Sequence, residues 1–322
     1  MSSPIRILLA PDAAFAFLVV ACGAAHHDAR KANGLIASEW QGEGIYLVDP
    51  ATSRRRLIPR TGSADDLAWS SDGRSLAFEL PGKVQGVDVY TIRSDGGDRR
   101  LVLENAYAPS WSPDGERLLV ARDTCTDYSD YGSNCTFYDS RVDLYTVRPD
   151  GTHLRHVARE PNGAWSPAWS PDGKRIAFLT NDGGLDLVDA DGGHKRRLGG
   201  RFGSEVSWSP DGSSLAFEIR GTAPDWGDID VVDVETGKRA NLTHRPGEES
   251  GPAWSPDGRK IVFLADMNCM WTGKCKPAED AEGGPRELWV MDADGRHLRQ
   301  LTRDSGLGYN PPAWQPVNEP RR

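Results

Sequence analysis

Short apolar runs separated by glycine-rich turns follow one another along most of this 322-residue chain. The clearest stretch has four short segments, at residues 167–170, 175–179, 185–189 and 195–198, of which the first three are rich in apolar residues. A Pro-Asp-Gly turn separates the first two runs, and an Ala-Asp-Gly-Gly turn separates the last two. Proline presets φ, aspartate bonds the local backbone and glycine accepts a positive φ, so both turns are typical of hairpins. The pattern therefore predicts four short antiparallel strands.

The same unit returns behind a repeated tryptophan phrase. Trp-Ser-Pro-Asp-Gly or a close variant occurs five times, and a sixth copy is shortened to Trp-Gln-Pro; the tryptophans are Trp69, Trp111, Trp169, Trp208, Trp254 and Trp314. They are separated by 42, 58, 39, 46 and 60 residues. A repeat of this length made of short strands is typical of a β-propeller, in which each repeat forms one four-stranded antiparallel blade. The sequence thus predicts an all-β fold.

The two ends of the repeat region complement one another. The pattern stops after Trp314 without a second, third or fourth strand, whereas residues 35–38, 45–49 and 56–58 resemble those three strands. We therefore expect a six-bladed β-propeller over residues 34–316, with the last blade shared by both termini and about 47 residues per blade. Such a closure leaves no open sheet edge. Residues 317–322 are expected to form a tail.

These phrases resemble the TolB-type six-bladed propeller, whose repeat reads roughly Pro-x-Trp-Ser-Pro-Asp-Gly-x-x-Ile-Ala-Phe, then a strand ending in Asp-x-Asp-Gly, then Leu-Thr. Residues 254–263, 292–295 and 301–302 match it, and residues 242–243 repeat its ending. The resemblance covers nearly everything after the leader. It implies the architecture and only outlines the role, because similar propellers occur in periplasmic scaffolds, in prolyl-oligopeptidase-like enzymes and in some lyases. Residues 23–33 are too few for the separate domain that precedes the propeller in TolB, so the TolB partner set is not carried over.

The first 33 residues have the pattern of an export leader and a tether. Arg6 stands near the start, and the apolar run at residues 13–21 is shorter than the about 20 residues that span a bilayer. Residues 19–23, Val-Val-Ala-Cys-Gly, resemble a bacterial lipobox, in which the cysteine is acylated after cleavage. We expect a signal peptide over residues 1–21, lipidation of Cys22 and a tether over residues 22–33. The alternative is an ordinary signal peptide with an incidental cysteine.

The cysteines also favour export of the protein. We expect it on the outer side of the cytoplasmic membrane or in the periplasm. Cys125 and Cys135 bracket one insertion, and Cys269 and Cys275 bracket another. Two local disulfides and one lipidated Cys22 therefore account for all five cysteines, and an oxidising compartment permits the bridges. Spacings of ten and six residues without matching histidines fit no common zinc pattern. We therefore expect no metal and no cofactor.

Length variation between the repeats falls in the loops between second and third strands. These loops lie on the side of the ring opposite to the two short turns, and we call that side the loop-rich face. The inserted segments are residues 38–44, 122–141, 220–228 and 266–286. Repeat proteins collect such insertions on the binding face.

Aromatic residues outside the repeat phrase gather in the loops of the same face. The candidates for ligand contact are Trp40, Trp165, Trp226, Trp271, Tyr128 and Tyr131. Aromatic side chains supply much contact area at interfaces. The alternative is that they fill the apolar bases of long loops.

Charge and missing motifs narrow the function. The chain has 38 basic and 47 acidic residues and no concentrated basic surface, so no nucleic-acid partner is expected. It has no Gly-x-Ser-x-Gly elbow and no Gly-rich phosphate loop. Two classes remain. The favoured one is a non-catalytic binding or scaffold module of the cell envelope that recognises a protein, peptide or glycan through the loop-rich face. The alternative is a lyase- or lactonase-like propeller enzyme with a site over the central channel, for which His244 is the only suitably placed histidine of the propeller.

Overall fold

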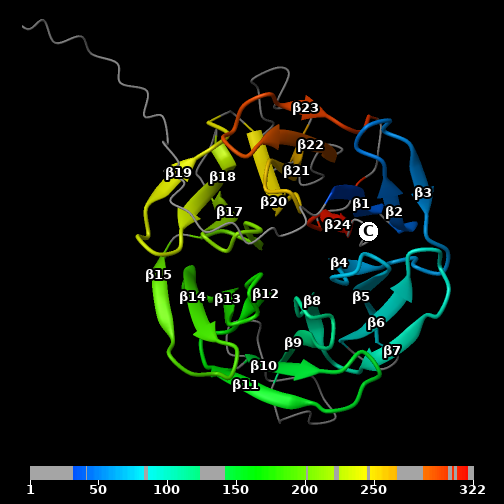
Figure 1. Cartoon of the computed structure of the whole chain (residues 1–322), viewed down its shortest axis with the longest axis vertical. Coiled ribbons are helices and arrows are strands. Elements are labelled where there is room, and N and C mark those ends of the chain that lie inside the picture. Colours follow the sequence, from blue (N-terminus) through cyan, green and yellow to red (C-terminus); the bar gives the residue numbers. More distant parts are fainter. Residues whose placement is uncertain are drawn as a thin grey trace, which may run out of the picture.

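The computed structural model describes residues 32–40, 42–82, 86–123, 142–200, 202–220, 225–244, 247–266, 286–303, 307 and 310–317. In these residues every regular element is a β-strand, and the strands are arranged in a ring (Figure 1). Nothing in these ranges forms a helix with the length and apolar character needed to cross a membrane. The all-β prediction is therefore confirmed.

Three sheets contain four consecutive antiparallel strands each. They are β4 (Asp65–Trp69), β5 (Ser75–Pro81), β6 (Val87–Arg93) and β7 (Arg100–Leu103); β8 (Tyr107–Trp111), β9 (Leu118–Asp123), β10 (Val142–Val147) and β11 (Arg155–Glu160); and β12 (Trp165–Trp169), β13 (Arg175–Leu179), β14 (Gly184–Asp189) and β15 (Arg196–Gly200). Each sheet has its first strand nearest the centre of the ring and its fourth at the outside (Figure 1). These are the four-stranded antiparallel blades of a β-propeller, as predicted from the repeat.

A fourth sheet combines strands from the two ends of the repeat region. Its order is β24 (Ala313–Val317), β1 (Ala32–Trp40), β2 (Gly44–Val48) and β3 (Arg55–Leu57). β24 pairs antiparallel with β1, with Trp314 opposite Ile36 and Ala313 opposite Ala37. The inner strand of this blade therefore comes from the end of the chain and the other three strands from its beginning.

The remaining strands form one eight-stranded sheet made of two sets. The sets are β16 (Val206–Trp208), β17 (Ser214–Arg220), β18 (Asp225–Asp233) and β19 (Arg239–Asn241), followed by β20 (Gly247–Trp254), β21 (Lys260–Asp266), β22 (Arg286–Asp292) and β23 (Arg299–Gln300). Within each set the strands are antiparallel. A short parallel pairing of β18 with β20, at Asp225–Gly247 and Gly227–Glu248, joins the two sets.

The repeated Ser-Pro-Asp-Gly phrase forms a self-contained turn. In one copy Ser170 Oγ donates to Asp172 Oδ1 at 2.6 Å, and the same oxygen accepts from the amide of Lys174 at 3.1 Å. Gly173 follows with a φ of 70°, which is the left-handed region that favours glycine. The same Ser–Asp hydrogen bond is present in the other four copies, Ser70–Asp72, Ser112–Asp114, Ser209–Asp211 and Ser255–Asp257. The phrase is therefore a structural hairpin turn.

The repeated tryptophans connect neighbouring blades. The indole N–H donates to a backbone carbonyl of the preceding inner strand at 3.1 Å in three pairs, Trp69 to Ala313, Trp208 to Ala168 and Trp314 to Ala253. Each acceptor lies one residue before the repeat tryptophan of its own blade. All three donor tryptophans are buried. These tryptophans therefore belong to the scaffold.

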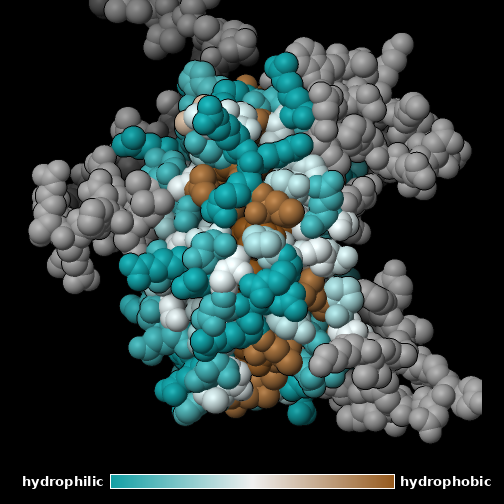
Figure 2. All heavy atoms as spheres, turned by 90° about the vertical axis from the view of Figure 1, so that its right-hand side faces the viewer, coloured by the Kyte–Doolittle hydropathy of each residue, from teal (hydrophilic) through white to brown (hydrophobic). Residues whose placement is uncertain are grey.

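The apolar core lies between the sheets, so it does not fill the centre of the ring. Each cluster of buried apolar residues combines side chains from two neighbouring sets of strands. Its largest members, Phe78, Phe178, Phe217 and Phe263, are fully buried on the second strands. Seen from the edge, the ring is mostly hydrophilic, with apolar residues visible in the gaps (Figure 2). The centre is thus left to the inner strands.

A candidate binding site in the central channel

A cavity of about 1460 Å³ lies at the centre of the ring, against the inner strands of every sheet. Its walls include the residue just before each repeat tryptophan, namely Ala68, Ser110, Ala168, Ser207, Ala253 and Ala313. The loop between β13 and β14, at Thr180 and Asn181, also borders it. That loop belongs to the loop-rich face, because the inner strands run from this face toward the Ser-Pro-Asp-Gly turns. The cavity is therefore the end of the channel on the loop-rich face.

The inner strands carry bulges where they line this cavity. The pairing register shifts between Asp65 and Ala68, and the strands of three other sets shift at the equivalent place. The third residue before each repeat tryptophan adopts a left-handed φ in five copies: 40° at Asp66, 51° at Ala108, 47° at Ser166, 54° at Glu205 and 59° at Gly251. Such a conformation costs a non-glycine residue about 1–3 kcal/mol and is concentrated at binding and catalytic sites. The repetition of this strain around the channel supports a functional cavity.

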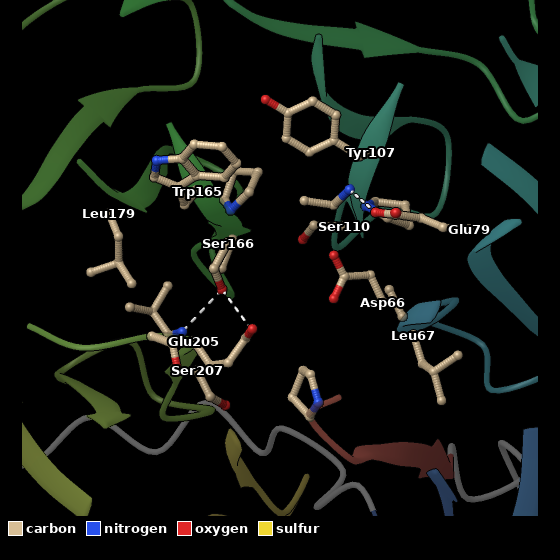
Figure 3. Close-up of a pocket in the computed structure, with 18 of the residues that line it drawn as sticks. Asp66, Leu67, Glu79, Tyr107, Ser110, Trp165, Ser166, Leu179, Glu205 and Ser207 are labelled. Atoms are coloured by element: carbon tan, nitrogen blue, oxygen red, sulfur yellow. Dashed lines mark hydrogen bonds between the residues drawn. The ribbon is translucent and has the colours of Figure 1, made fainter. Parts of the chain in front are cut away.

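Two of these residues, Asp66 and Glu205, bring carboxyl groups to the cavity (Figure 3). Asp66 shares a hydrogen bond with the buried side chain of Glu79, and Glu79 Oε1 also accepts from the amide of Ala108. Burial raises the pKa of both carboxyl groups, and the nearby charge of Asp66 raises the pKa of Glu79 further. The Asp66–Glu79 pair is therefore held with a shared proton across two neighbouring strands.

Glu205 lies on the opposite side of the cavity from this pair (Figure 3). Its Oε2 accepts from Ser166 Oγ at 3.0 Å, and Ser166 Oγ in turn accepts from the amide of Val206 at 3.1 Å. Burial raises the pKa of Glu205 to about 8, and the charge of Asp66 adds to the rise. The carboxyl group of Glu205 therefore titrates close to neutral pH.

Two aromatic side chains complete the rim. Tyr107, the first residue of β8, and Trp165, the first of β12, stack with ring centroids 5.9 Å apart and planes 28° apart. The indole N–H of Trp165 donates to Asn181 Oδ1 on the neighbouring loop. Burial raises the pKa of Tyr107 above its ordinary value, so its hydroxyl stays protonated at neutral pH. The pair is a partly exposed aromatic wall at the entrance.

The structure places two of the six aromatic candidates. Trp165 borders the cavity and is half-buried. Trp40 is 5 % exposed, packs in the core against Tyr46 and Leu307, and has the guanidinium of Arg55 4.6 Å from its ring centroid. The prediction that both lie in loops is wrong, because they occupy the end of β1 and the start of β12. The burial of Trp40 favours the alternative that it fills an apolar base.

The other sequence candidates have no described side chain. Trp226 falls within β18, but its side chain lies outside the described part. Tyr128, Tyr131, Trp271, Cys22, Cys125, Cys135, Cys269 and Cys275 all lie outside the described residues. In the described ranges no group of three or more His, Cys, Asp or Glu is arranged to hold a metal ion. His244 is exposed, follows β19 and does not border the cavity.

The channel carboxyl groups were missed by sequence reasoning. Asp66 and Glu205 both stand three residues before a repeat tryptophan, which is the one signal the sequence offers. Equivalent positions hold Ala108, Ser166 and Gly251, so no acidic pattern repeats. Alignment of the repeats on their tryptophans would have found them, as acidic residues three positions before two of the tryptophans.

Raised carboxyl pKa values predict that stability falls as the pH rises. Glu205 has a folded-state pKa of about 8 against an ordinary value of 4.5, so its contribution is full below pH 4.5 and is lost between there and pH 8. We expect Glu205→Gln to remove about 1–2 kcal/mol of this pH dependence, after allowance for solvent screening. Urea unfolding at pH 5, 6.5 and 8 measures it. An identical pH slope in the exposed control Glu116→Gln and in Glu205→Gln would contradict the assignment.

The fold and the cavity together define a β-propeller protein with a strained, carboxylate-bearing central channel. The family described as TolB beta propeller domain matches residues 135–270 of the chain. This match covers less than half of the chain, and the fold of the described residues is similar to that of the TolB β-propeller.

Curated relatives are similar over different extents. An uncharacterized peptidase, YuxL, of Bacillus subtilis is 24 % identical over 242 residues, which are 71 % of this chain and 32 % of the relative. The uncharacterized protein Atu1656 of Agrobacterium fabrum is 25 % identical over 274 residues, 71 % of this chain and 83 % of the relative. The Tol-Pal system protein TolB of Anaeromyxobacter dehalogenans is 29 % identical over 117 residues, 34 % of this chain and 24 % of the relative. The chain thus spans about a third of YuxL and a quarter of TolB.

Solved structures share the fold at low sequence identity. TolB from Acinetobacter baumannii has a TM-score of 0.66 and 20 % identity, with 88 % of this chain and 67 % of that chain covered. An oligogalacturonate lyase in complex with manganese has a TM-score of 0.53 and 17 % identity, covering 83 % and 78 %. At these identities the similarity establishes the fold alone.

Proposed function

We propose that this protein is a non-catalytic binding or scaffold module of the cell envelope that recognises a protein, peptide or glycan through the loop-rich face. One observation carries the proposal: the channel cavity is lined by the inner strands of every sheet and bordered by strained, non-glycine bulge residues. Strain of this kind persists where the surrounding fold holds a ligand-contact geometry in place. The likeness to the Tol-Pal system protein TolB supports a protein partner.

The proposal includes the architecture of the ring. Counting the two sets of the eight-stranded sheet as separate blades gives a closed six-bladed propeller with one blade shared by both ends. Its strands β1 and β24 extend from residue 32 and to residue 317, slightly beyond the predicted range of 34–316. Six apolar clusters between neighbouring sets support this count. We further propose Trp165, Trp226, Trp271, Tyr128 and Tyr131 as residues that contact the partner.

A photo-crosslinking amino acid tests which face binds. At Asn181, exposed on the loop-rich face beside Trp165, it should trap an envelope partner in cells. At Lys174, exposed in the Ser-Pro-Asp-Gly turn of the same blade, it should trap none. Both positions are exposed on the same blade, and they lie on opposite faces of the ring. Equal trapping at the two positions, or trapping only at Lys174, would overturn the proposal.

We also propose that the chain is exported and held at the membrane, with residues 1–21 removed and Cys22 acylated. One acyl chain binds membranes only marginally, so stable anchoring requires the further chains of a bacterial lipoprotein. Cys22→Ser should move the protein from the membrane fraction to the soluble periplasmic fraction. A mature N-terminus mapped elsewhere by mass spectrometry would exclude lipidation at Cys22. The bridges Cys125–Cys135 and Cys269–Cys275 belong to the same proposal, and peptide mapping without reduction tests them.

A propeller enzyme is the second candidate, because the channel holds carboxyl groups with raised pKa values, which suit acid–base chemistry. The fold is shared with an oligogalacturonate lyase, and one relative is named an uncharacterized peptidase, YuxL; both are consistent with this class without favouring it over the binding role. Turnover of oligogalacturonate, a lactone or a peptide by the purified chain, lost in Glu205→Gln, would replace the binding role with this one.

A further inference from the structure

We infer that the channel cavity receives an organic cation, the ammonium or guanidinium group of a lysine or arginine side chain presented on a peptide. The inference deepens the proposed binding function and rests on it. It combines three independent features of the cavity: its charge, its aromatic wall and its size.

The ionisable residues of the lining are mostly acidic, and a bound cation would favour their ionised forms. The acidic residues that border the cavity are Asp66, Glu79, Asp123 and Glu205, and the basic one is Arg122. Arg122 is already engaged, because its Nε donates to the carbonyl of Asn105 at 3.2 Å and its guanidinium lies 5.9 Å from the ring centroid of Tyr145. A cation entering the cavity therefore meets carboxyl groups from β4, β5 and the segment before β16.

The aromatic wall makes the site suitable for an organic cation. Tyr107 and Trp165 lie along one side of the cavity, with Asp66 and Glu79 on a second side and Glu205 on a third (Figure 3). Ammonium and guanidinium groups gain about 0.5–2 kcal/mol from an aromatic face, and more when they are desolvated. The carboxyl groups would bind the charged end of a lysine or arginine side chain, and the two aromatic rings would pack against its alkyl chain.

The same residues are poorly suited to a bare metal ion. No three His, Cys, Asp or Glu of the described ranges converge as metal ligands, although several carboxyl groups share the cavity. A cavity of about 1460 Å³ is larger than the roughly 300–1,000 Å³ of small-molecule pockets. It has room for several residues of a peptide that enters from the loop-rich face.

Binding must release protons. Asp66, Glu79 and Glu205 have raised pKa values, with Asp65, Glu218 and Asp123 as the other acidic neighbours and Tyr107 neutral. A cation favours the ionised carboxylates, so below their pKa values it has to displace protons. Affinity should therefore rise about ten-fold from pH 6 to pH 8.5. For each proton released, linkage allows a rise of at most about ten-fold per pH unit, so the expected change lies within this limit.

Titration calorimetry on the full chain tests the inference with end-blocked tetralysine, tetraarginine, tetraglutamate, spermine and calcium chloride as probes. We expect tetralysine or tetraarginine to bind, with protons released to the buffer and weaker binding at high salt. Asp66→Asn and Glu205→Gln should each weaken this binding at least ten-fold. Asparagine tolerates the left-handed backbone at position 66, so Asp66→Asn should stay folded. The exposed control Glu116→Gln, on the opposite face, should leave binding unchanged.

The other outcomes overturn the inference in distinguishable ways. Binding of spermine without either peptide would identify a free polyamine as the ligand. Binding of calcium alone would make the cavity a metal site. If no cationic probe binds while the crosslinker at Asn181 still traps a partner, the proposed binding function is supported and the inference of a cationic ligand is wrong. Loss of trapping at Asn181 as well would remove both.

Discussion

Deletion of residues 311–316 should abolish cooperative folding of the whole propeller. These residues include most of β24, the inner strand that completes the sheet of β1, β2 and β3. Trp314 is 7 % exposed in the core, and its removal alone costs about 3–5 kcal/mol. Domains are stable by only about 5–15 kcal/mol, so the loss of the strand and its hydrogen bonds exceeds what the fold can tolerate.

β24 is bonded to two neighbouring blades as well as to its own. The indole of Trp69 donates to the carbonyl of Ala313, and the indole of Trp314 donates to Ala253. Gln315 accepts from the amide of Leu35 at 3.1 Å and donates to the carbonyl of Gly73 at 2.7 Å. The deletion should therefore remove the single unfolding transition in circular dichroism. Deletion of residues 318–322 is the control, and an unchanged melting curve for both deletions would disprove closure through β24.

Gly73→Ala should destabilise the protein by about 3–5 kcal/mol, through left-handed strain and a steric clash together. Gly73 has a φ of 69°, and a Cβ atom there would lie 2.1 Å from the carbonyl oxygen of Pro316. Because that oxygen belongs to β24, relief of the clash has to move the closing strand. Chemical denaturation measures the change in the free energy of unfolding.

Gly173→Ala is the matched control for this substitution. Gly173 has a φ of 70° in the equivalent turn, but its nearest neighbour, Pro113, would lie 3.8 Å from the new Cβ atom. Only the backbone strain applies there, so we expect a cost of about 1–2 kcal/mol. Equal costs for the two variants would show that the contact with Pro316 is unimportant.

The blade could be predicted from sequence because its causes are local. The Ser-Pro-Asp-Gly turn closes through Ser170 and Asp172, two residues apart, and Gly173 supplies the required backbone conformation. Strand composition and turn chemistry recur with the tryptophans, so one copy explains the others. The incomplete last copy and the surplus strands at the beginning likewise predicted the pairing of β24 with β1.

The channel could not be predicted in the same way, because its residues meet only after the blades are assembled around the ring. Tyr107 stacks on Trp165 across two blades, and Glu205 takes a hydrogen bond from Ser166, 39 residues earlier. The burial of Trp40 could not be predicted either, because Trp40 is covered by Leu307, a residue far away in the sequence. An aromatic residue in a strand-and-loop pattern does not reveal whether a distant segment will cover it.

The sequence by itself thus determined the repeat, the four-stranded blade and the use of both ends, since short-range turn chemistry and apolar patterning decide them. Only the tertiary structure decided which polar groups face the channel. Their left-handed bulges at Asp66, Ser166 and Glu205 have no required residue type, and the raised pKa values come from burial and from charges on other blades. Burial and neighbouring charge are properties of the assembled ring, and no stretch of the chain contains them.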